Sequence, residues 1–155
     1  MARRRPPRLH TSAYLGLRRY FVTICTAGRR PCFKSPDVVN SVLYQIRLTG
    51  RERHMALLAY CFMPDHVHIV VEALEETADL RRFVKAFKQR SGFEHRRRTG
   101  GPLRQSGYYD RVLRNDESTE AVVRCVWNNP VRRGLVRQVA DWRFSGSDVF
   151  DIARV

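Results

Sequence analysis

The sequence predicts an α+β domain, a ferredoxin-like split βαβ sandwich in which helices pack on one face of an antiparallel sheet. Three observations predict it. The chain has 155 residues, enough to bury one core without disulfide or metal staples. Apolar residues alternate at period two in four segments and recur at helical spacing in three others. These segments follow the order strand, helix, strand, strand, helix, strand, helix, which is the order of the split βαβ arrangement.

The first strand is expected at residues 20–26, where aromatic and β-branched side chains alternate, and Gly28 falls in the turn after it. The first helix should begin at Pro36 and run to about residue 48, because apolar residues recur there at helical spacing. Gly50 is expected to end this helix, since glycine is common just beyond a helix C-terminus.

Two further strands are expected to form an antiparallel hairpin, at residues 54–63 and 66–72. Pro64 and Asp65 between them are typical turn residues, and β-branched side chains dominate the second strand. The strand that begins at His66 should therefore lie in the middle of the sheet.

A second helix is expected to begin near Leu80, because apolar residues recur from there at helical spacing while basic residues occupy its other faces. Residues 94–105 are rich in arginine, glycine and proline and should form a mobile basic loop. A fourth strand is predicted at residues 108–114.

The last predicted helix spans residues 118–129 and combines an apolar face with acidic residues in its first turn. It should stop at Asn129, because a residue before proline is pushed out of helical geometry. Cys125 and Asn129 are four residues apart, so they should stack on one face of this helix. Residues 131–155 are expected to fold back over the domain, and no repeat or linker indicates a second one. We therefore predict a flexible basic arm at residues 1–14 and a single domain at residues 15–155.

The chain is strongly basic, because 29 Lys and Arg outnumber 15 Asp and Glu and give a formal net charge of +14. Most of these cations are arginine, which pairs bidentately with phosphate, so nucleic acid is the expected partner. A merely soluble basic protein is the alternative, since net charge bears on association and not on fold. The candidate phosphate-binding side chains of the arm, the second helix and the basic loop are Arg3, Arg4, Arg5, Arg82, Lys85, Lys88, Arg96, Arg97 and Arg98.

The four cysteines form no Cys-x-x-Cys pair; they are Cys25, Cys32, Cys61 and Cys125. No apolar stretch after the basic arm is long enough to be a signal peptide or a membrane span. The thiols are therefore expected to be reduced and the compartment cytoplasmic.

His66 and His68 are the strongest candidates for a metal site. Side chains alternate along a strand, so both imidazoles should point to one side while Val67 and Ile69 point to the other. The two residues lie about 7 Å apart along the strand, close enough to share one ion. Two ordinary half-exposed strand histidines would give the same pattern. The rest of the sequence therefore has to distinguish a metal site from this alternative.

Four motifs occur here in the order in which they occur in a known family. They are Met63-Pro64-Asp65-His66-Val67-His68, Tyr108-Tyr109-Asp110-Arg111, Asn128-Asn129-Pro130-Val131-Arg132-Arg133-Gly134-Leu135-Val136 and Asp141-Trp142-Arg143-Phe144-Ser145. On these motifs the sequence resembles the single-tyrosine HUH transposases, and among them most closely the REP-associated tyrosine transposases. The resemblance extends over residues 20–147.

The resemblance implies cleavage and rejoining of single-stranded DNA at hairpin-bearing sites. The chain is expected to be a monomer or a homodimer. In the family, two histidines and a polar residue on the last core helix hold Mg²⁺ or Mn²⁺, which implies His66, His68 and Asn129 here. Such an ion polarises the scissile phosphate and neutralises charge that develops on its oxygens. The family nucleophile is a tyrosine one helical turn before the third ligand, and it forms a 5′-phosphotyrosine that keeps the bond energy for rejoining.

The sequence departs from the family at the nucleophile, because Cys125 stands one turn before Asn129. A thiol falls well short of the position of a phenol oxygen, and misplacement by ~1 Å can cost about a hundredfold in rate. Tyr108 and Tyr109 are the nearby substitutes, but the family also has aromatics in this strand, where they are more often packing residues than nucleophiles. Three interpretations stay open: a transposase that cuts with Cys125 or a recruited tyrosine, a DNA-binding relative that has lost cleavage, and a basic protein with a vestigial fold and another partner.

Overall fold

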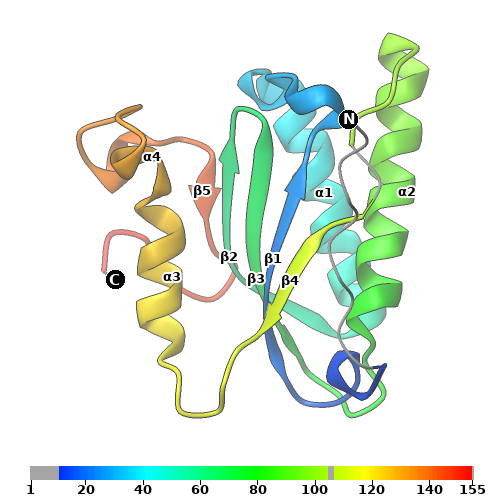
Figure 1. Cartoon of the computed structure of the whole chain (residues 1–155), viewed down its shortest axis with the longest axis vertical. Helices are drawn as coiled ribbons and strands as arrows, with labels where there is room; N and C mark the ends of the chain where they lie inside the picture. The colour runs from blue at the N-terminus through cyan, green and yellow to red at the C-terminus, as the bar shows by residue number, and fades with distance from the viewer. Residues whose placement is uncertain (1–10, 105–106, 155) are drawn as a thin grey trace.

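The computed structural model describes residues 11–104 and 107–154, and at its centre lies a five-stranded sheet in the order β4-β1-β3-β2-β5 (Figure 1). All neighbouring strands are antiparallel, so the predicted α+β class with an antiparallel sheet is confirmed. The strands are β1 (Arg19–Cys25), β2 (Met55–Met63), β3 (His66–Ala73), β4 (Tyr109–Val112) and β5 (Ser145–Gly146), and the helices are α1 (Pro36–Arg53), α2 (Leu80–Thr99), α3 (Thr119–Trp127) and α4 (Asn129–Arg132).

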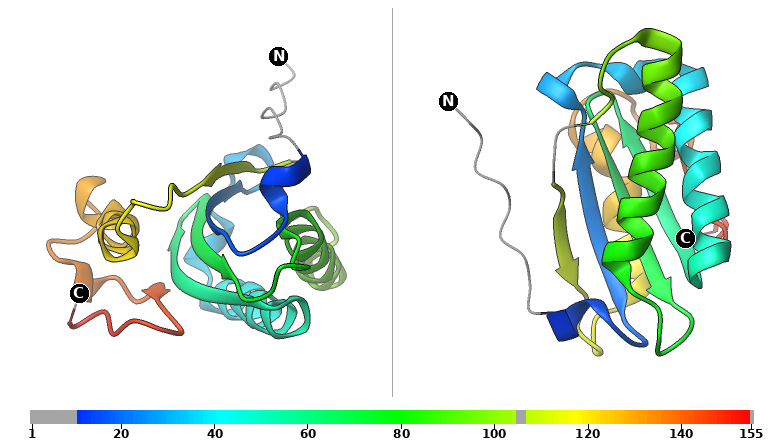
Figure 2. Two further views of the ribbon diagram at one scale, coloured as in Figure 1. Left: turned by 90° about the horizontal axis from the view of Figure 1, so that it is seen from below. Right: turned by 90° about the vertical axis from the view of Figure 1, so that its right-hand side faces the viewer.

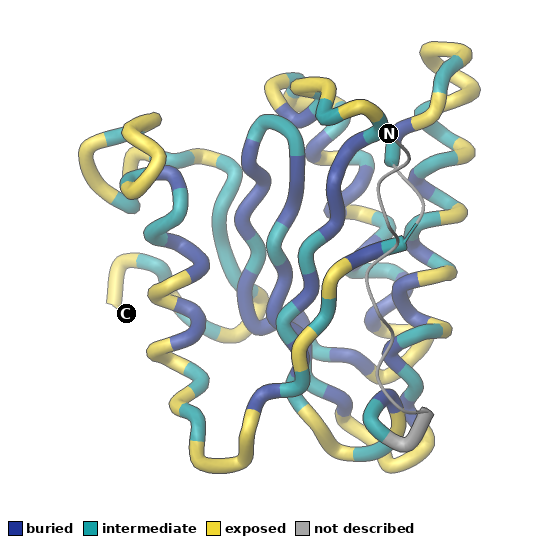
Figure 3. Tube along the Cα trace, in the orientation of Figure 1, coloured by how far each residue is buried: buried dark blue, intermediate teal, exposed yellow. Residues whose placement is uncertain are grey.

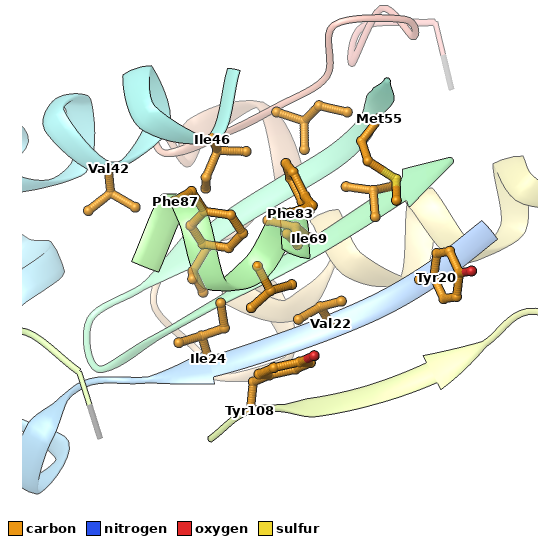
Figure 4. Close-up of a cluster of buried hydrophobic side chains, with 14 of the residues drawn as sticks. Tyr20, Val22, Ile24, Val42, Ile46, Met55, Ile69, Phe83, Phe87 and Tyr108 are labelled. Carbon is orange, nitrogen blue, oxygen red and sulfur yellow. The ribbon is translucent and has the colours of Figure 1, made fainter. Parts of the chain in front are cut away.

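Helices cover both faces of the sheet (Figure 2, left). α1 and α2 pack on one face, around a core that includes Val22, Phe83 and Phe87 (Figure 4). α3 packs on the opposite face, against β2 and β3, in a second cluster that includes Val126 and Trp127. The prediction that the helices pack on one face of the sheet is therefore confirmed for α1 and α2. It does not hold for α3, which packs on the opposite face. The physical reason is that β2 and β3 are apolar on both faces, so the second face also needs a cover.

β2 and β3 form the predicted hairpin, and β3 lies between β1 and β2. The turn at Pro64 and Asp65 is held by a neighbouring segment. The Pro64 carbonyl accepts a hydrogen bond from Phe33 N at 3.0 Å, and the Asp65 carbonyl accepts one from Thr26 N at 2.9 Å. This support holds in place the chain that leads directly into His66.

α1 runs through Gly50 to Arg53, so the prediction that Gly50 ends the helix is wrong. The helix ends instead at His54, which adopts the left-handed conformation with a φ of 58°. Gly50 is buried, and a Cβ added there would lie 2.7 Å from the carbonyl oxygen of Met55. The absence of a Cβ at Gly50 therefore allows α1 to approach β2 closely, and the glycine does not end the helix.

α2 continues to Thr99, so residues 94–99 are helical and the predicted mobile loop is wrong over that stretch. The Asp79 side chain caps the N-terminus, and Gly100, with a φ of 79°, ends the helix. Beyond Ser91 the α2 side chains are half-buried or exposed (Figure 3). Arginine has a high intrinsic helix propensity, which explains why a basic segment without an apolar stripe can still be helical.

α3 ends at Trp127, and Asn129 begins the short helix α4 with Pro130 in its first turn. Proline suits that position because the N–H that it lacks would have no partner there. The predicted helix over residues 118–129 is therefore divided, and Cys125 and Asn129 belong to two successive helices.

The C-terminal segment folds back over β2, as predicted. β5 pairs with the middle of β2. The Phe62 carbonyl of β2 accepts a hydrogen bond from Trp142 Nε1 at 3.0 Å, and Phe62 N donates to the Phe144 carbonyl at 2.9 Å. From the α3 side, Trp127 Nε1 donates to the Gly146 carbonyl at 3.1 Å. Two indoles thus fasten the segment to the sheet.

The predicted N-terminal arm lies partly outside the described residues, and this part includes Arg3, Arg4 and Arg5. Thr11–Tyr14 forms a 3-10 helix. Tyr14 is buried, and the Arg81 guanidinium of α2 lies 5.1 Å from its ring centre. The end of the arm therefore packs on the domain. Among the described helices, none is long and apolar enough to cross a membrane.

Candidate metal and nucleic-acid site

His66 and His68 lie at the start of β3 and point together to the face that α3 covers. His68 stands opposite Cys61 of β2, which belongs to the α3-side core, whereas Val67 and Ile69 belong to the opposite core. The Nε2 atoms of the two histidines are 3.1 Å apart. The imidazoles therefore meet on one face, as the strand pattern predicts.

Asp65 and Thr23 each hold one histidine ring, and Arg29 holds Asp65. Asp65 Oδ1 lies 2.6 Å from His66 Nδ1, and Asp65 Oδ2 accepts from Arg29 Nε at 3.0 Å. Thr23 Oγ1 lies 2.8 Å from His68 Nδ1. Because an ionised carboxylate only accepts hydrogen bonds, neutral His66 carries its proton on Nδ1 and turns the lone pair of Nε2 toward His68.

Both imidazoles are neutral near pH 7. Burial lowers the pKa of His66, which is 6% exposed, although the hydrogen bond to Asp65 opposes this. Burial and the charges of His66, Arg132 and Arg133 lower the pKa of His68 to about 3. Burial acts to raise the pKa of Asp65, but the hydrogen bond from His66 and a nearby arginine charge bring it below its ordinary value.

The donor atoms fit a divalent cation. An octahedral ion with ligands at about 2.1 Å places neighbouring ligand atoms about 3.0 Å apart, and the two Nε2 atoms are 3.1 Å apart. Coordination needs neutral imidazoles, and the hydrogen bond from His66 to Asp65 is of the kind that orients a histidine for metal binding. Within residues 11–104 and 107–154, no three His, Cys, Asp or Glu gather in a way that could hold a metal ion.

Arg132 joins the other two candidate site residues, Cys125 and Asn129. One terminal nitrogen of its guanidinium donates to Asn129 Oδ1 at 3.2 Å and to the Cys125 carbonyl at 3.0 Å, and lies 3.5 Å from Cys125 Sγ. Asn129 Nδ2 donates to the Val126 carbonyl at 3.0 Å. Cys125 is exposed on the surface of α3, whereas Val126 is buried against the sheet.

The two adjacent tyrosines lie in different surroundings. Tyr108 is 8% exposed and packs in the core under α1 and α2 (Figure 4). Tyr109 is 50% exposed and stands opposite Thr23 of β1, which in turn stands opposite His68 of β3. Residues directly opposite in neighbouring strands point to the same face. Tyr109 therefore shares the face of the histidine pair at a distance of two strands, or about 10 Å.

α3 leaves part of this face open. It packs on β2 and β3, while on β1 and β4 the residues Phe21 and Thr23 are half-buried and Tyr109 and Arg111 are exposed. The Phe21 ring centre lies 5.3 Å from that of His68. An accessible aromatic and basic surface thus adjoins the histidine pair.

Exposed basic side chains occupy both ends of α2, with Arg82 and Lys85 near its start and Arg96, Arg97 and Arg98 in its last turns. The C-terminal end of α2 lies at the same end of the domain as the β2–β3 turn (Figure 1). Lys88 differs from the others, because its ammonium donates to the Gly107 carbonyl at 2.9 Å and lies 5.7 Å from the Tyr108 ring centre. Lys88 is therefore engaged within the fold.

Sequence reasoning did not single out several residues around the site. Thr23 and Arg29 lie far from the histidines along the chain, and strand pairing and the fold of the turn bring them together. Asp65 and Arg132 stood within motifs already noted. The available signals were the position of Asp65 beside His66 and of Arg132 one helical turn after Asn129.

Comparison with known proteins identifies a family. A family model described as "Transposase IS200 like" matches residues 17–114, a stretch that contains β1 to β4 and both histidines. The chain is 24% identical over 138 residues to a Haemophilus influenzae protein named as a REP-associated tyrosine transposase, with 81% of this chain and 77% of that protein covered. It is 27% identical over 99 residues to the REP-associated tyrosine transposase of Escherichia coli, with 61% of this chain and 56% of that protein covered.

A solved structure has the same fold. It is a REP-associated tyrosine transposase bound to a REP hairpin, and it matches this chain with a TM-score of 0.75 at 21% identity. The match covers 96% of this chain and 94% of that one. At this identity the likeness concerns the fold.

Proposed function

The chain belongs to the IS200-like transposase family, and from this premise we propose that it binds hairpin-bearing single-stranded DNA at a metal site formed by His66, His68 and Asn129. The observation that carries the proposal is the 3.1 Å separation of the two histidine Nε2 atoms, with Asp65 orienting one ring. The ion, Mg²⁺ or Mn²⁺, would polarise the scissile phosphate and neutralise charge on its oxygens. The relative solved with a REP hairpin supports this class of DNA as the ligand.

Hydrogen bonds within the chain set which nitrogen of His66 and of His68 carries the proton, and so whether each Nε2 lone pair can coordinate the ion. His66 keeps its proton on Nδ1, toward Asp65. The Thr23 hydroxyl can either donate to His68 Nδ1 or accept from it, because a hydroxyl has both capacities. When Thr23 accepts, His68 carries its proton on Nδ1, and both Nε2 atoms are free to coordinate.

The open surface on β1 and β4 is the proposed path of the strand beside the metal site. Phe21 and Tyr109 offer aromatic faces there, and stacking of bases on such rings is a general mode of single-strand binding. The proposed phosphate contacts are the exposed cations in the last turns of α2, Arg96, Arg97 and Arg98, and the arginine run at residues 3–5 of the arm.

We expect cleavage to be weak, because Cys125 occupies the position of the family tyrosine. Its thiol reaches less far than a phenol, and the structure surrounds it with solvent and the guanidinium of Arg132. Since rate depends steeply on the position of the attacking atom, the chain is proposed to bind hairpin DNA and to cut it poorly.

A transposase that cuts with Tyr109 is the second candidate, favoured by the exposure of this residue on the face of the histidine pair. In that reaction the phenol oxygen forms a bond to phosphorus and the phenol proton passes to water. The bond to the 3′ oxygen of the preceding nucleotide breaks, and that oxygen leaves with the electron pair and takes up a proton.

The test is formation of a covalent protein–DNA adduct, followed on a denaturing gel with labelled hairpin DNA and Mn²⁺. We expect little adduct from the unmodified chain and strong adduct from Cys125→Tyr, lost again when His66→Ala is added. Strong adduct from the unmodified chain, abolished by Tyr109→Phe but not by Cys125→Ser, would make Tyr109 the nucleophile. Equal affinity for hairpin and scrambled strands would favour a basic protein with another partner.

A further inference from the structure

We propose that Arg132 is a positioning residue. Its guanidinium holds the Asn129 amide away from the metal until a DNA phosphate replaces Asn129 as the hydrogen-bond partner of the guanidinium. This inference rests on the proposed function, in which Asn129 is the third ligand. It adds a coupling between DNA binding and metal binding within the chain.

In the absence of DNA, both polar atoms of the Asn129 side chain make a hydrogen bond within the chain. Its Oδ1 accepts from Arg132 at 3.2 Å, and its Nδ2 donates to the Val126 carbonyl at 3.0 Å. The backbone of α4 sets this arrangement, since Arg132 N donates to the Asn128 carbonyl at 3.0 Å and places the arginine one turn beyond Asn129.

The Arg132 guanidinium has only neutral partners among the described residues. Arg132 is exposed, and within residues 11–104 and 107–154 its hydrogen bonds go to the Cys125 carbonyl, the Cys125 sulfur and the Asn129 amide oxygen, all of them neutral. A phosphate offers charge-assisted, bidentate hydrogen bonds, which are roughly twice as strong as bonds between neutral groups. A DNA phosphate at the site should therefore displace Asn129 as the hydrogen-bond partner of the guanidinium.

A guanidinium and a divalent ion on one amide oxygen repel each other. When Arg132 binds a DNA phosphate instead, that repulsion is removed and Asn129 Oδ1 is free to coordinate. DNA should therefore raise the affinity of the chain for the divalent ion, and the ion should raise its affinity for DNA by the same factor.

The experiment compares Arg132→Gln with Arg124→Gln, a matched loss of one charge. Arg124 is exposed on α3, and its guanidinium is paired with Glu120 at 3.4 Å. Mn²⁺ affinity is measured by electron paramagnetic resonance with and without a hairpin oligonucleotide. In the unmodified chain and in Arg124→Gln, DNA should tighten Mn²⁺ binding at least about fivefold, the lower range of typical coupling. In Arg132→Gln, Mn²⁺ should bind more tightly without DNA, the enhancement should shrink, and Asn129→Ala should remove the gain.

A metal-free measurement separates this inference from the proposed function. In EDTA, the Asn129 side-chain amide signal in an NMR spectrum should shift when hairpin DNA is added, and should be shifted already in free Arg132→Gln. If Mn²⁺ does not bind yet the signal moves, the metal site is wrong and the exchange of Arg132 between Asn129 and phosphate stands. If DNA leaves the signal unmoved, or if Arg132→Gln equals Arg124→Gln in Mn²⁺ affinity and coupling, the inference is overturned.

Discussion

Removing two positive charges from one end of α2 should weaken DNA binding far more than removing two from the other end. Arg96 and Arg98 are exposed in the last turns of the helix, at the end of the domain where the β2–β3 turn leads into the histidine pair (Figure 1). Arg82 and Lys85 are exposed near the start of the same helix, at the far end. The pairs Arg96→Gln/Arg98→Gln and Arg82→Gln/Lys85→Gln therefore change net charge equally and differ in place.

The size of the effect follows from counterion release. Each phosphate contact contributes ~0.7 to the slope of log affinity against log salt for a single strand and ~0.9 for a duplex stem. Two lost contacts should flatten the slope by about 1.4 to 1.8 units. Between about 50 and 200 mM salt, the unmodified chain should then lose about 7- to 12-fold more affinity than Arg96→Gln/Arg98→Gln.

The measurement is fluorescence anisotropy of a labelled hairpin oligonucleotide across a salt series. The Arg82→Gln/Lys85→Gln pair should keep nearly the slope of the unmodified chain. Equal flattening by both pairs would mean that the whole length of α2 contacts phosphate. A larger effect of Arg82→Gln/Lys85→Gln would place the DNA at the opposite end of the domain and refute the reasoning.

Three further predictions concern the fold around the site. Iodoacetamide should modify exposed Cys125 in the folded chain, whereas Cys61, fully buried and with a pKa raised by burial to about 11, should react only after unfolding, as mass spectrometry can check. Gly50→Ala should cost about 1–3 kcal/mol in urea unfolding through overpacking, whereas Gly92→Ala, with no atom near its added Cβ, should stabilise α2 by about 0.5–1 kcal/mol. Burial lowers the pKa of His68 to about 3, so the unfolded chain takes up its proton first as pH falls below about 6.5. In metal-free buffer, stability should therefore drop toward pH 3 by up to about 1.4 kcal/mol per pH unit, and His68→Gln should flatten this dependence.

Helices and strands with a strong periodicity were predictable from the sequence. The prediction failed where a tertiary contact determines the local structure. Alternating side chains in β1 and the apolar stripe of α1 identify these elements from the sequence alone. Gly50 resembles a helix end, and only its closeness to the Met55 carbonyl explains why it lies inside a helix. Residues 94–99 have the composition of a loop, yet they continue a helix whose earlier turns are anchored in the core.

The candidate site was predictable in its residues more than in its geometry. Alternation along a strand is enough to put His66 and His68 on one face. Their close approach depends on ring orientations set by Asp65 and by Thr23, which is 45 residues from His68 in the chain. The exposure of Cys125 and the reach of Arg132 depend on the turn from α3 into α4, which periodicity does not describe.

The C-terminal segment also bears on self-association. β2 is nine residues long and almost wholly apolar, and without β5 it would be the edge of the sheet. β5, the backbone bond from Asp148 N to the Leu57 carbonyl and the Trp142 indole together occupy hydrogen-bonding groups along that edge. An uncovered edge of this kind offers a template for a strand from another molecule. A chain cut before Trp142 should therefore form β-rich aggregates even though both histidines and the whole of α3 would still be present.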